Sequence, residues 1–244
     1  MNLLAEAFAW IFSPDRLTGS SPLPAAIGLH LFYTFLAVII AAVIAIPLGY
    51  YIGHTGRGRN LAVGISGAAR AIPSFGLILL LVLIIGVTQK PLAATIAFVL
   101  LGIPSILAGA YAGLEAIDRR VVDSARAVGM TEWQILFKVE IPLGLPLLIG
   151  GLRAGALQIV ATVVLAAYVT LGGLGTYILA GIPLRRFDMI LGSAIVIVAL
   201  ALVLDGLFAL VQHVVVPRGV TAGRPRELRT PSSRRRTVVE SPTV

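Results

Sequence analysis

The sequence contains no cysteine and only three histidines, and no more than 12% of its 244 residues are charged. The absence of cysteine excludes disulfide bonds and thiolate metal sites. The histidines do not lie at metal-ligand spacings, so no metal site is expected. A chain with 58% hydrophobic residues and so little charge is too apolar for a soluble domain of this length, which predicts a membrane protein.

Sequence motifs of enzymes are missing as well. No Gly-rich phosphate-binding loop ends in Lys-Ser or Lys-Thr, so the chain is not expected to bind ATP through such a loop. No Ser/His/Asp spacing indicates a catalytic triad. The sequence therefore predicts no catalytic residues, no cofactor and no enzyme activity. The net charge of +8 would suit nucleic acid, but the positive residues lie beside apolar runs, so no nucleic-acid partner is expected.

Apolar runs long enough to cross a bilayer recur along the chain and predict five membrane helices. The runs are residues 29–53, 61–86, 91–114, 147–171 and 189–216. At about 1.5 Å per residue, each run spans roughly 30 Å of hydrocarbon. The predicted fold class is therefore all-α, a polytopic membrane protein whose transmembrane domain covers residues 27–216.

Lysine and arginine are distributed unequally between the two sides that these helices create. One side holds Arg57, Arg59, Arg119, Arg120, Arg126, Lys138, Arg218, Arg224, Arg226, Arg229, Arg234, Arg235 and Arg236. The other side holds Arg16, Lys90, Arg185 and Arg186. Because cytoplasmic loops carry the excess of positive residues, the N-terminus is predicted outside the cell and the C-terminus in the cytoplasm.

The two ends of the chain differ from the apolar middle. The stretch from Leu3 to Phe12 is too short to span, so residues 1–26 are predicted as an extracytoplasmic segment in the membrane interface, with Trp10 at headgroup level. Residues 217–244 are rich in Arg, Pro, Ser and Thr, which predicts a disordered basic cytoplasmic tail. This tail either contacts anionic lipid or is solvated and only fixes the topology.

Several residues inside the apolar runs are unusual for a membrane helix. Pro47, Pro73 and Pro104 each free a backbone carbonyl and permit a bend. Asp205 is the one acid well inside a run, and such a group is a candidate for transport chemistry. A structural pairing of Asp205 with Arg153 or with a backbone donor is favoured over that role.

Small residues mark two further places. The fourth run contains Gly150, Gly151, Ala154, Gly155, Ala156 and Ala161, which suit either tight helix packing or a moving gate. The following segment from Leu171 to Gly175 contains Gly172 and Gly173 and predicts a turn with irregular backbone. It is either the outer end of a translocation path or a connecting turn.

The histidines are expected at the edges of the membrane domain. His30 and His213 lie near the ends of predicted spans and are expected at the interface, and His54 is expected in a loop.

The longest polar segment between apolar runs covers residues 115–145 and predicts a helix-turn-helix. Asp123 and Arg126 are three residues apart and can pair on one helix face. Gly129 can end the first helix in a left-handed conformation, and Thr131 can cap the second helix. Two interpretations remain open from these patterns, an amphipathic loop lying on the bilayer and a docking surface for a soluble partner.

The small residues Ala125 and Ala127 favour the second interpretation, because they would let a partner approach closely. The second helix carries Trp133, Leu136 and Phe137 on an apolar face, as an amphipathic segment on lipid would.

One family resemblance bears on this choice. Asp123-Ser124-Ala125, three residues, Gly129, nine residues and Val139-Glu140-Ile141-Pro142 resemble the cytoplasmic "EAA" loop of ABC-importer permeases. That loop has the pattern Glu-Ala-Ala, three residues, Gly, nine residues and Ile-x-Leu-Pro. The departures are conservative. The resemblance extends over residues 30–210, and the segments 45–49, 71–75 and 172–175 agree with it.

The resemblance implies a type I transmembrane domain that pairs with a second permease subunit in the bacterial cell membrane, surrounded by lipid. It also implies two cytoplasmic ATP-binding subunits, which would hydrolyse ATP, and an extracytoplasmic solute-binding protein. The contact with the ATPase would fall on Asp123, Ser124, Ala125, Arg126, Ala127, Val128, Gly129, Met130 and Pro142. Pro73, Tyr168, Gly172, Gly173 and Gly175 are candidates for the translocation path or gate.

Within this family the chain is most similar to permeases for osmoprotectants, namely glycine betaine, carnitine, choline and proline. A quaternary amine would find aromatic contacts at Tyr33, Phe75 or Tyr168, unless these are packing residues. The alternatives are a permease for another small solute such as methionine, an ion-coupled secondary transporter and a membrane-embedded enzyme.

Overall fold

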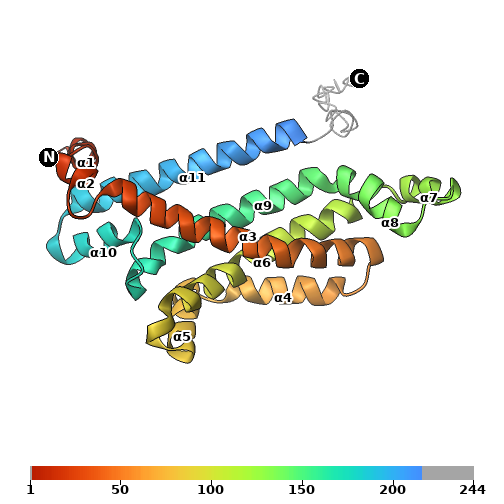
Figure 1. The fold of residues 1–244 in the computed structure, drawn as a ribbon, viewed down its shortest axis with the longest axis horizontal. Coiled ribbons are helices and arrows are strands. Elements are labelled where there is room, and N and C mark those ends of the chain that lie inside the picture. The colour runs from red at the N-terminus through yellow and green to blue at the C-terminus, as the bar shows by residue number, and fades with distance from the viewer. Residues whose placement is uncertain (1, 216–244) are drawn as a thin grey trace, which may run out of the picture.

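The computed structural model describes residues 2–215, and all regular structure in this range is helical. The first half contains α1 (Leu3–Ile11), α2 (Pro14–Thr18), α3 (Leu23–Thr55), α4 (Arg59–Ala71), α5 (Ser74–Ile85), η1 (Val87–Gln89) and α6 (Lys90–Glu115). The second half contains α7 (Arg119–Ala127), α8 (Glu132–Ile135), the π-helical turn η2 (Leu136–Glu140), α9 (Ile141–Val163), η3 (Val164–Val169), α10 (Gly175–Leu184) and α11 (Phe187–Val215). The long helices run along the longest axis of an elongated molecule (Figure 1).

Four helical stretches are long and apolar enough to cross a membrane, and the bent pair α4–α5 makes a fifth if it is counted as one span. The predicted all-α architecture with about five spans is therefore confirmed. The fourth helix differs in its start, because α9 begins at Ile141 rather than at 147. Pro142 lies in the first turn of α9, where backbone N–H groups have no acceptor within the helix. The proline is therefore compatible with a helix that begins at Ile141.

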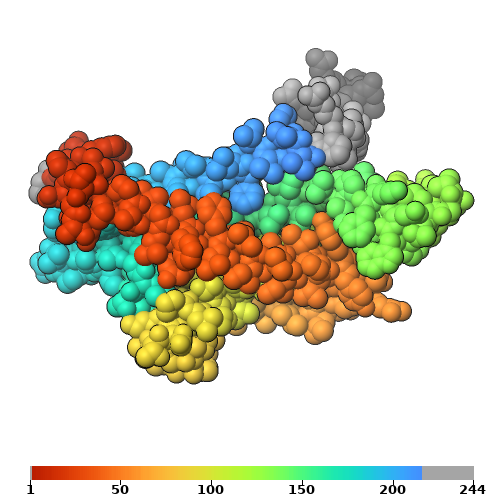
Figure 2. Space-filling model, viewed as in Figure 1, coloured from red at the N-terminus to blue at the C-terminus, as the bar shows by residue number. Residues whose placement is uncertain are grey.

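The second span is broken at Pro73, as the sequence predicts. Ile72 and Pro73 have extended backbone conformations, and α4 and α5 meet at an angle of 92°. Proline disfavours the helical conformation of the residue before it, which explains why α4 ends at Ala71. Pro47 and Pro104 lie inside uninterrupted helices. Figure 2 shows α5 protruding from the long side of the molecule.

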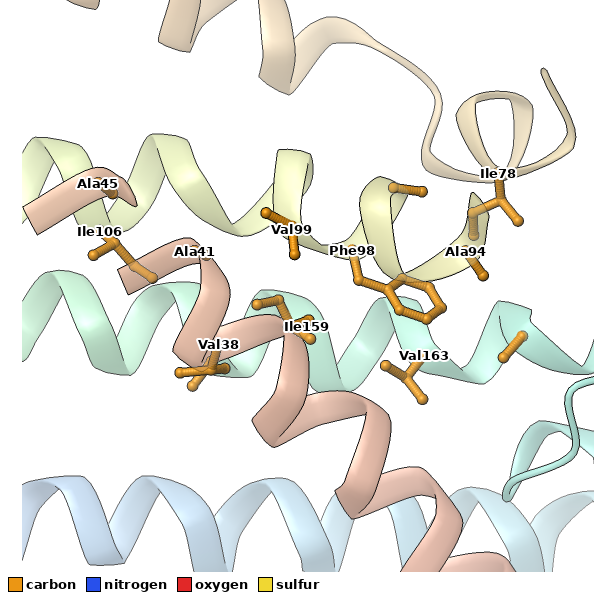
Figure 3. Packing of buried hydrophobic residues seen from close by; sticks show 14 of the residues in the cluster. Val38, Ala41, Ala45, Ile78, Ala94, Phe98, Val99, Ile106, Ile159 and Val163 are labelled. Carbon is orange, nitrogen blue, oxygen red and sulfur yellow. The ribbon is translucent and has the colours of Figure 1, made fainter. Parts of the chain in front are cut away.

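The centre of the molecule is formed by α3, α6 and α9. Phe98 and Ile106 of α6 and Ile159 of α9 are fully buried in the cluster that these three helices share (Figure 3). Helices α6 and α9 approach backbone to backbone: a Cβ atom added at Gly109 would lie 2.6 Å from the Cα atom of Gly151. Only small residues permit such an approach.

Tight packing of the fourth helix was expected from six small residues, and it occurs on one face only. Gly151 and Gly155 are buried against α6, whereas a Cβ atom at Gly150 would meet nothing within 4 Å. Ala154 and Ala161 are exposed. A helix face repeats every three to four residues, so neighbours in the sequence point to different surroundings.

A second apolar cluster joins α1, α10 and α11 at the end of the molecule where the N-terminus lies (Figure 1). The Trp10 side chain is 5% exposed and packs edge-to-face on Tyr177, with ring centroids 5.2 Å apart. Trp10 is therefore packed inside the protein rather than exposed, and its predicted position at headgroup level stays a prediction. Gly192 of α11 leaves the space that the indole ring fills.

Two histidine predictions are wrong. His30 is completely buried in α3, and its Nε2 atom lies 3.1 Å from the carbonyl oxygen of Val160 in α9. His54 belongs to the last turn of α3 rather than to a loop. The tail predicted for 217–244, with its seven arginines, lies outside the described residues.

Candidate functional site

The polar loop between α6 and α9 forms one end of the molecule, opposite the end that holds α1 and α10 (Figures 1 and 2). Asp118 begins α7 as its N-cap, because its carboxylate accepts a hydrogen bond of 2.9 Å from the backbone N–H of Arg120. The predicted helix-turn-helix is present as α7, a turn at residues 128–131, and α8.

The turn itself is built by local signals in the sequence. Gly129 has a φ of 86°, in the left-handed region, and the N–H of Met130 donates to the carbonyl of Ala125 at 3.1 Å. Thr131 and Gln134 form a reciprocal capping box at the start of α8. The predicted stop at Gly129 and the predicted cap at Thr131 are both confirmed.

Arg126 connects the two loop helices. It makes the predicted pair with Asp123 at 3.3 Å, and its guanidinium also binds both carboxylate oxygens of Glu132, at 2.8 and 3.0 Å. The hydrogen bonds to Glu132 raise the pKa of Arg126 above its ordinary value. The sequence did not predict the contact between Arg126 and Glu132, because Glu132 comes close to Arg126 only when the chain reverses at Gly129.

Ala125 is a buried residue of α7. Its side chain is 8% exposed and faces the interior of the chain, so its methyl group is not on the free surface of the loop. The predicted contact of Ala125 with a partner stays a prediction. The exposed residues of the predicted contact segment are Asp123, Ser124, Arg126, Ala127, Val128 and Gly129.

Val128 stands out on this exposed surface. It is an apolar residue at the tip of the loop, and its side chain is 78% exposed. Trp133 and Phe137 are also exposed, and their rings stack on one another with centroids 5.9 Å apart. The loop therefore presents apolar side chains among charged ones, as a docking surface requires.

The loop is tied to the membrane helices by ionisable side chains. The Nδ1 atom of His54, at the end of α3, lies 2.5 Å from a carboxylate oxygen of Glu140, and its Nε2 atom lies 3.4 Å from Glu132. Arg59 at the start of α4 pairs with Glu115 at the end of α6, at 2.9 Å. These side-chain contacts join α3 to the loop and α4 to α6, and no local sequence pattern indicates them.

Glu140 reaches His54 from an unusual piece of backbone. It is the last residue of the π-helical turn η2, and its side chain is buried. Such turns shift the following side chains around the helix axis and are frequent at functional sites. Pro142 follows directly in α9 and is half-buried.

At the opposite end, the Gly-rich segment forms the predicted irregular turn between η3 and α10. Gly172 and Gly173 both have a φ of 81°, and a Cβ atom at Gly172 would lie 2.8 Å from the Leu29 side chain of α3. A Cβ atom at Gly175 would overlap the carbonyl of Val164. Glycine is therefore favoured by the positive φ at Gly172 and Gly173 and by the close packing at Gly172 and Gly175.

The three aromatic residues singled out in the sequence separate into two groups. Phe75 of α5 and Tyr168 of η3 pack edge-to-face with centroids 4.8 Å apart, and both are exposed. Tyr33 instead packs on Phe98 in the core. Phe75 and Tyr168 are thus exposed, whereas Tyr33 is half-buried against the core.

Asp205 has the partner that was favoured from the sequence. Its carboxylate accepts hydrogen bonds from two nitrogens of the Arg153 guanidinium, and this contact joins α11 to α9. This bidentate geometry satisfies both charges within the chain. The structural interpretation of Asp205 is thereby supported over a role in ion transport.

These features define a polytopic helical membrane protein with a helical loop projecting from one end. A family model described as "Binding-protein-dependent transport system inner membrane component" matches residues 41–219. The chain belongs to this family, and it is a permease subunit of the ABC importer class, as the loop pattern predicted.

Curated relatives cover most of the chain. The carnitine transport permease protein OpuCB of Listeria monocytogenes is 31% identical over 195 residues, which cover 80% of this chain and 88% of the relative. The osmoprotectant import permease protein OsmW of Salmonella typhimurium is 36% identical over 197 residues, covering 78% of this chain and 90% of the relative.

The fold is also found among solved structures. An inward facing structure of the MetNI methionine ABC transporter aligns with a TM-score of 0.69, covering 80% of this chain and 96% of that chain. The sequence identity is 20%, so this likeness supports the fold and not the solute.

Proposed function

We propose that this permease subunit imports a small osmoprotectant, either a quaternary amine such as glycine betaine, carnitine or choline, or proline. The observation that carries this proposal is the similarity, over about four fifths of the chain, to a permease named for carnitine transport. A methionine permease is the second candidate, and only the fold of the MetNI transporter favours it.

The proposed complex contains a second permease subunit, two cytoplasmic ATP-binding subunits that hydrolyse ATP, and an extracytoplasmic solute-binding protein. Family membership and the exposed loop support these partners. In this complex the chain itself catalyses no bond chemistry. The loop end would lie in the cytoplasm and the N-terminus outside, as the excess of positive residues at the loop end favours.

The loop at residues 123–130 is the proposed contact with the ATPase. Val128 and the neighbouring charged side chains supply the exposed surface, and the buried Ala125 supports it from inside. His54 and Glu140 then transmit a movement of the loop to α3 and α9, because their contact joins α3 to η2, which leads directly into α9. Coupled movement of packed helices as rigid bodies is the expected response.

The translocation path is proposed to pass the break in the second span. Pro73 sets the 92° bend there, and Tyr168 contacts α5 through Phe75. The turn with Gly172, Gly173 and Gly175 closes the opposite end of the path.

Uptake by intact cells tests the solute. Cells that lack their own osmoprotectant uptake would express the permease with its ATP-binding subunits and binding protein. We expect accumulation of labelled glycine betaine, carnitine or choline, and growth rescue at high osmolarity. Methionine uptake without any osmotic rescue would show that the proposed solute class is wrong.

A matched pair of glycine variants tests the loop. Gly129→Val places a β-branched residue at a φ of 86°, which strains the turn of the loop. Gly56→Val imposes comparable strain at a φ of 69°, on the same end of the molecule but outside the loop. Both side chains would enter open space. We expect both variants to reach the membrane, and only Gly129→Val to lose the co-purifying ATPase and solute uptake. Retention of the ATPase by Gly129→Val would remove the loop from the proposed interface.

A further inference from the structure

A polar cavity lies beside the break in the second span. It has a volume of about 320 Å³ and opens between the end of α4, the start of α5, α6 and α9. Its polar lining consists of Arg70, Ser74, Ser105 and Gln158, from four different helices. Arg70 and Gln158 are exposed and Ser74 and Ser105 are half-buried, so the cavity is open to the surroundings of this chain.

The cavity lies near the middle of the membrane domain. Leu101 and Ser105 line it, and both lie about 15 Å from the nearer end of α6 at 1.5 Å per residue. Ile159 of α9 packs against Gly102 of α6, which places the adjacent Gln158 at the same level. The cavity therefore lies close to the midpoint of α6.

Arg70 is the charged group of this cavity. Within the described part of the chain, only Arg70 and Arg153 are cations away from the ends of the predicted spans. Arg153 is neutralised by Asp205, whereas Arg70 makes no ion pair or side-chain hydrogen bond with any described residue. A cation inside a membrane span without a counter-charge from the described chain is a candidate functional residue.

The chemistry of the lining fits one class of ligand. A guanidinium binds a carboxylate through two parallel hydrogen bonds, and the Ser and Gln side chains can add further donors. Phe75 directly follows Ser74 and packs on Tyr168, so aromatic surface lies on the same bend. Aromatic rings attract quaternary ammonium groups. Neither of these two rings lines the cavity, so the cavity itself offers a cation for a carboxylate.

We propose that this cavity is a transient binding site for zwitterionic solutes within the permease, with Arg70 binding the solute carboxylate. This inference rests on the proposed osmoprotectant transport and adds a selectivity to it. Glycine betaine, carnitine and proline carry a carboxylate that Arg70 binds. Choline carries no carboxylate, so Arg70 does not strengthen its binding.

The test compares Arg70→Gln with the wild type and with Arg185→Gln, which removes a positive charge at the end of α10. Binding of labelled glycine betaine and of labelled choline would be measured on the purified complex of permease and ATP-binding subunits, without the binding protein. We expect Arg70→Gln to weaken glycine betaine binding at least about tenfold and to leave choline binding unchanged. Arg185→Gln should bind both as the wild type does, and Arg70→Lys should retain part of the glycine betaine affinity.

Two results would overturn the site: glycine betaine binding by Arg70→Gln at the wild-type level, or no glycine betaine binding by the wild-type complex. An equal loss of glycine betaine and choline binding would also overturn it, because it would assign Arg70 a structural role. Uptake in cells separates this inference from the proposed function. If the wild type imports no osmoprotectant, the proposed function fails. If Arg70→Gln imports glycine betaine normally, only the inference fails.

Discussion

Helix α9 is joined to α6 and to α11 in two different ways. Against α6 it presents glycines, and the two backbones touch at Gly109 and Gly151. Against α11 it presents Arg153, which binds Asp205. In the span that contains α6, 56% of the residues in the most apolar 18-residue stretch are buried. The corresponding share for α11 is only 6%.

The two interfaces show two ways in which membrane helices are held together. Lipid is as apolar as the side chains, so burial of apolar surface does little to bring membrane helices together. Van der Waals contact over a long stretch holds two helices together where small residues recur, as along α6 and α9. Where they do not, as between α9 and α11, polar side-chain contacts join the two helices.

A large side chain at Gly151 is expected to disrupt the interface between α6 and α9 most strongly. A Cβ atom there would lie 2.7 Å from the Cα atom of Gly109, so backbone would have to move. We expect Gly151→Leu to cost about 3 kcal/mol or more and to abolish stable expression. Gly150→Leu is the matched control, because its Cβ atom would meet nothing within 4 Å. Thermal unfolding in detergent measures the difference, and equal stability of the two variants would disprove backbone contact.

An intermediate effect is expected at the charged contact between α9 and α11. Asp205→Asn leaves the Arg153 guanidinium without its counter-charge, so the variant should unfold at a lower temperature than the wild type. The loss should be smaller than for Gly151→Leu, and ATPase activity per assembled complex should persist. The double variant Arg153→Met with Asp205→Leu should recover most of the stability, because it removes both charges together. Lost transport in a fully assembled Asp205→Asn complex would instead place Asp205 in the transport mechanism.

The smallest effect is expected at the second polar contact between these helices. The Gln212 side chain of α11 donates to the carbonyl oxygen of Pro146 in α9 at 3.4 Å, which is long for a hydrogen bond. Gln212→Leu should therefore change the free energy of unfolding by only about 0.5 kcal/mol. A loss as large as that of Asp205→Asn would show that α11 depends on more than its ion pair.

Features with a local cause were predictable from the sequence. The break at Pro73, the stop at Gly129 and the cap at Thr131 each follow from the conformational limits of one or two residues. The Asp123–Arg126 pair follows from helix periodicity. The long uncharged runs predicted the membrane helices because length and hydropathy decide which segments enter lipid.

Features that depend on contacts between distant segments were not predictable. His54 lies 86 positions before Glu140, and no spacing indicates that they meet. Ala125 was predicted on the docking surface because its size permits close approach, but size does not tell which face of α7 turns inward. Trp10 was placed at headgroup level on its residue type alone, and its burial in the space beside Gly192 was not predicted.

The sequence by itself determined the all-α membrane architecture, the break in the second span, the helix-turn-helix of the loop and the family of the chain. Hydropathy, backbone restriction and motif spacing are properties of short segments, and they act whatever the rest of the chain does. Tertiary structure alone decided that α6 and α9 touch through their glycines and that His54 holds the loop to α3. It also decided that Arg70 faces a polar cavity while Arg153 has an acid partner. These relations arise only when helices from distant parts of the chain pack side by side.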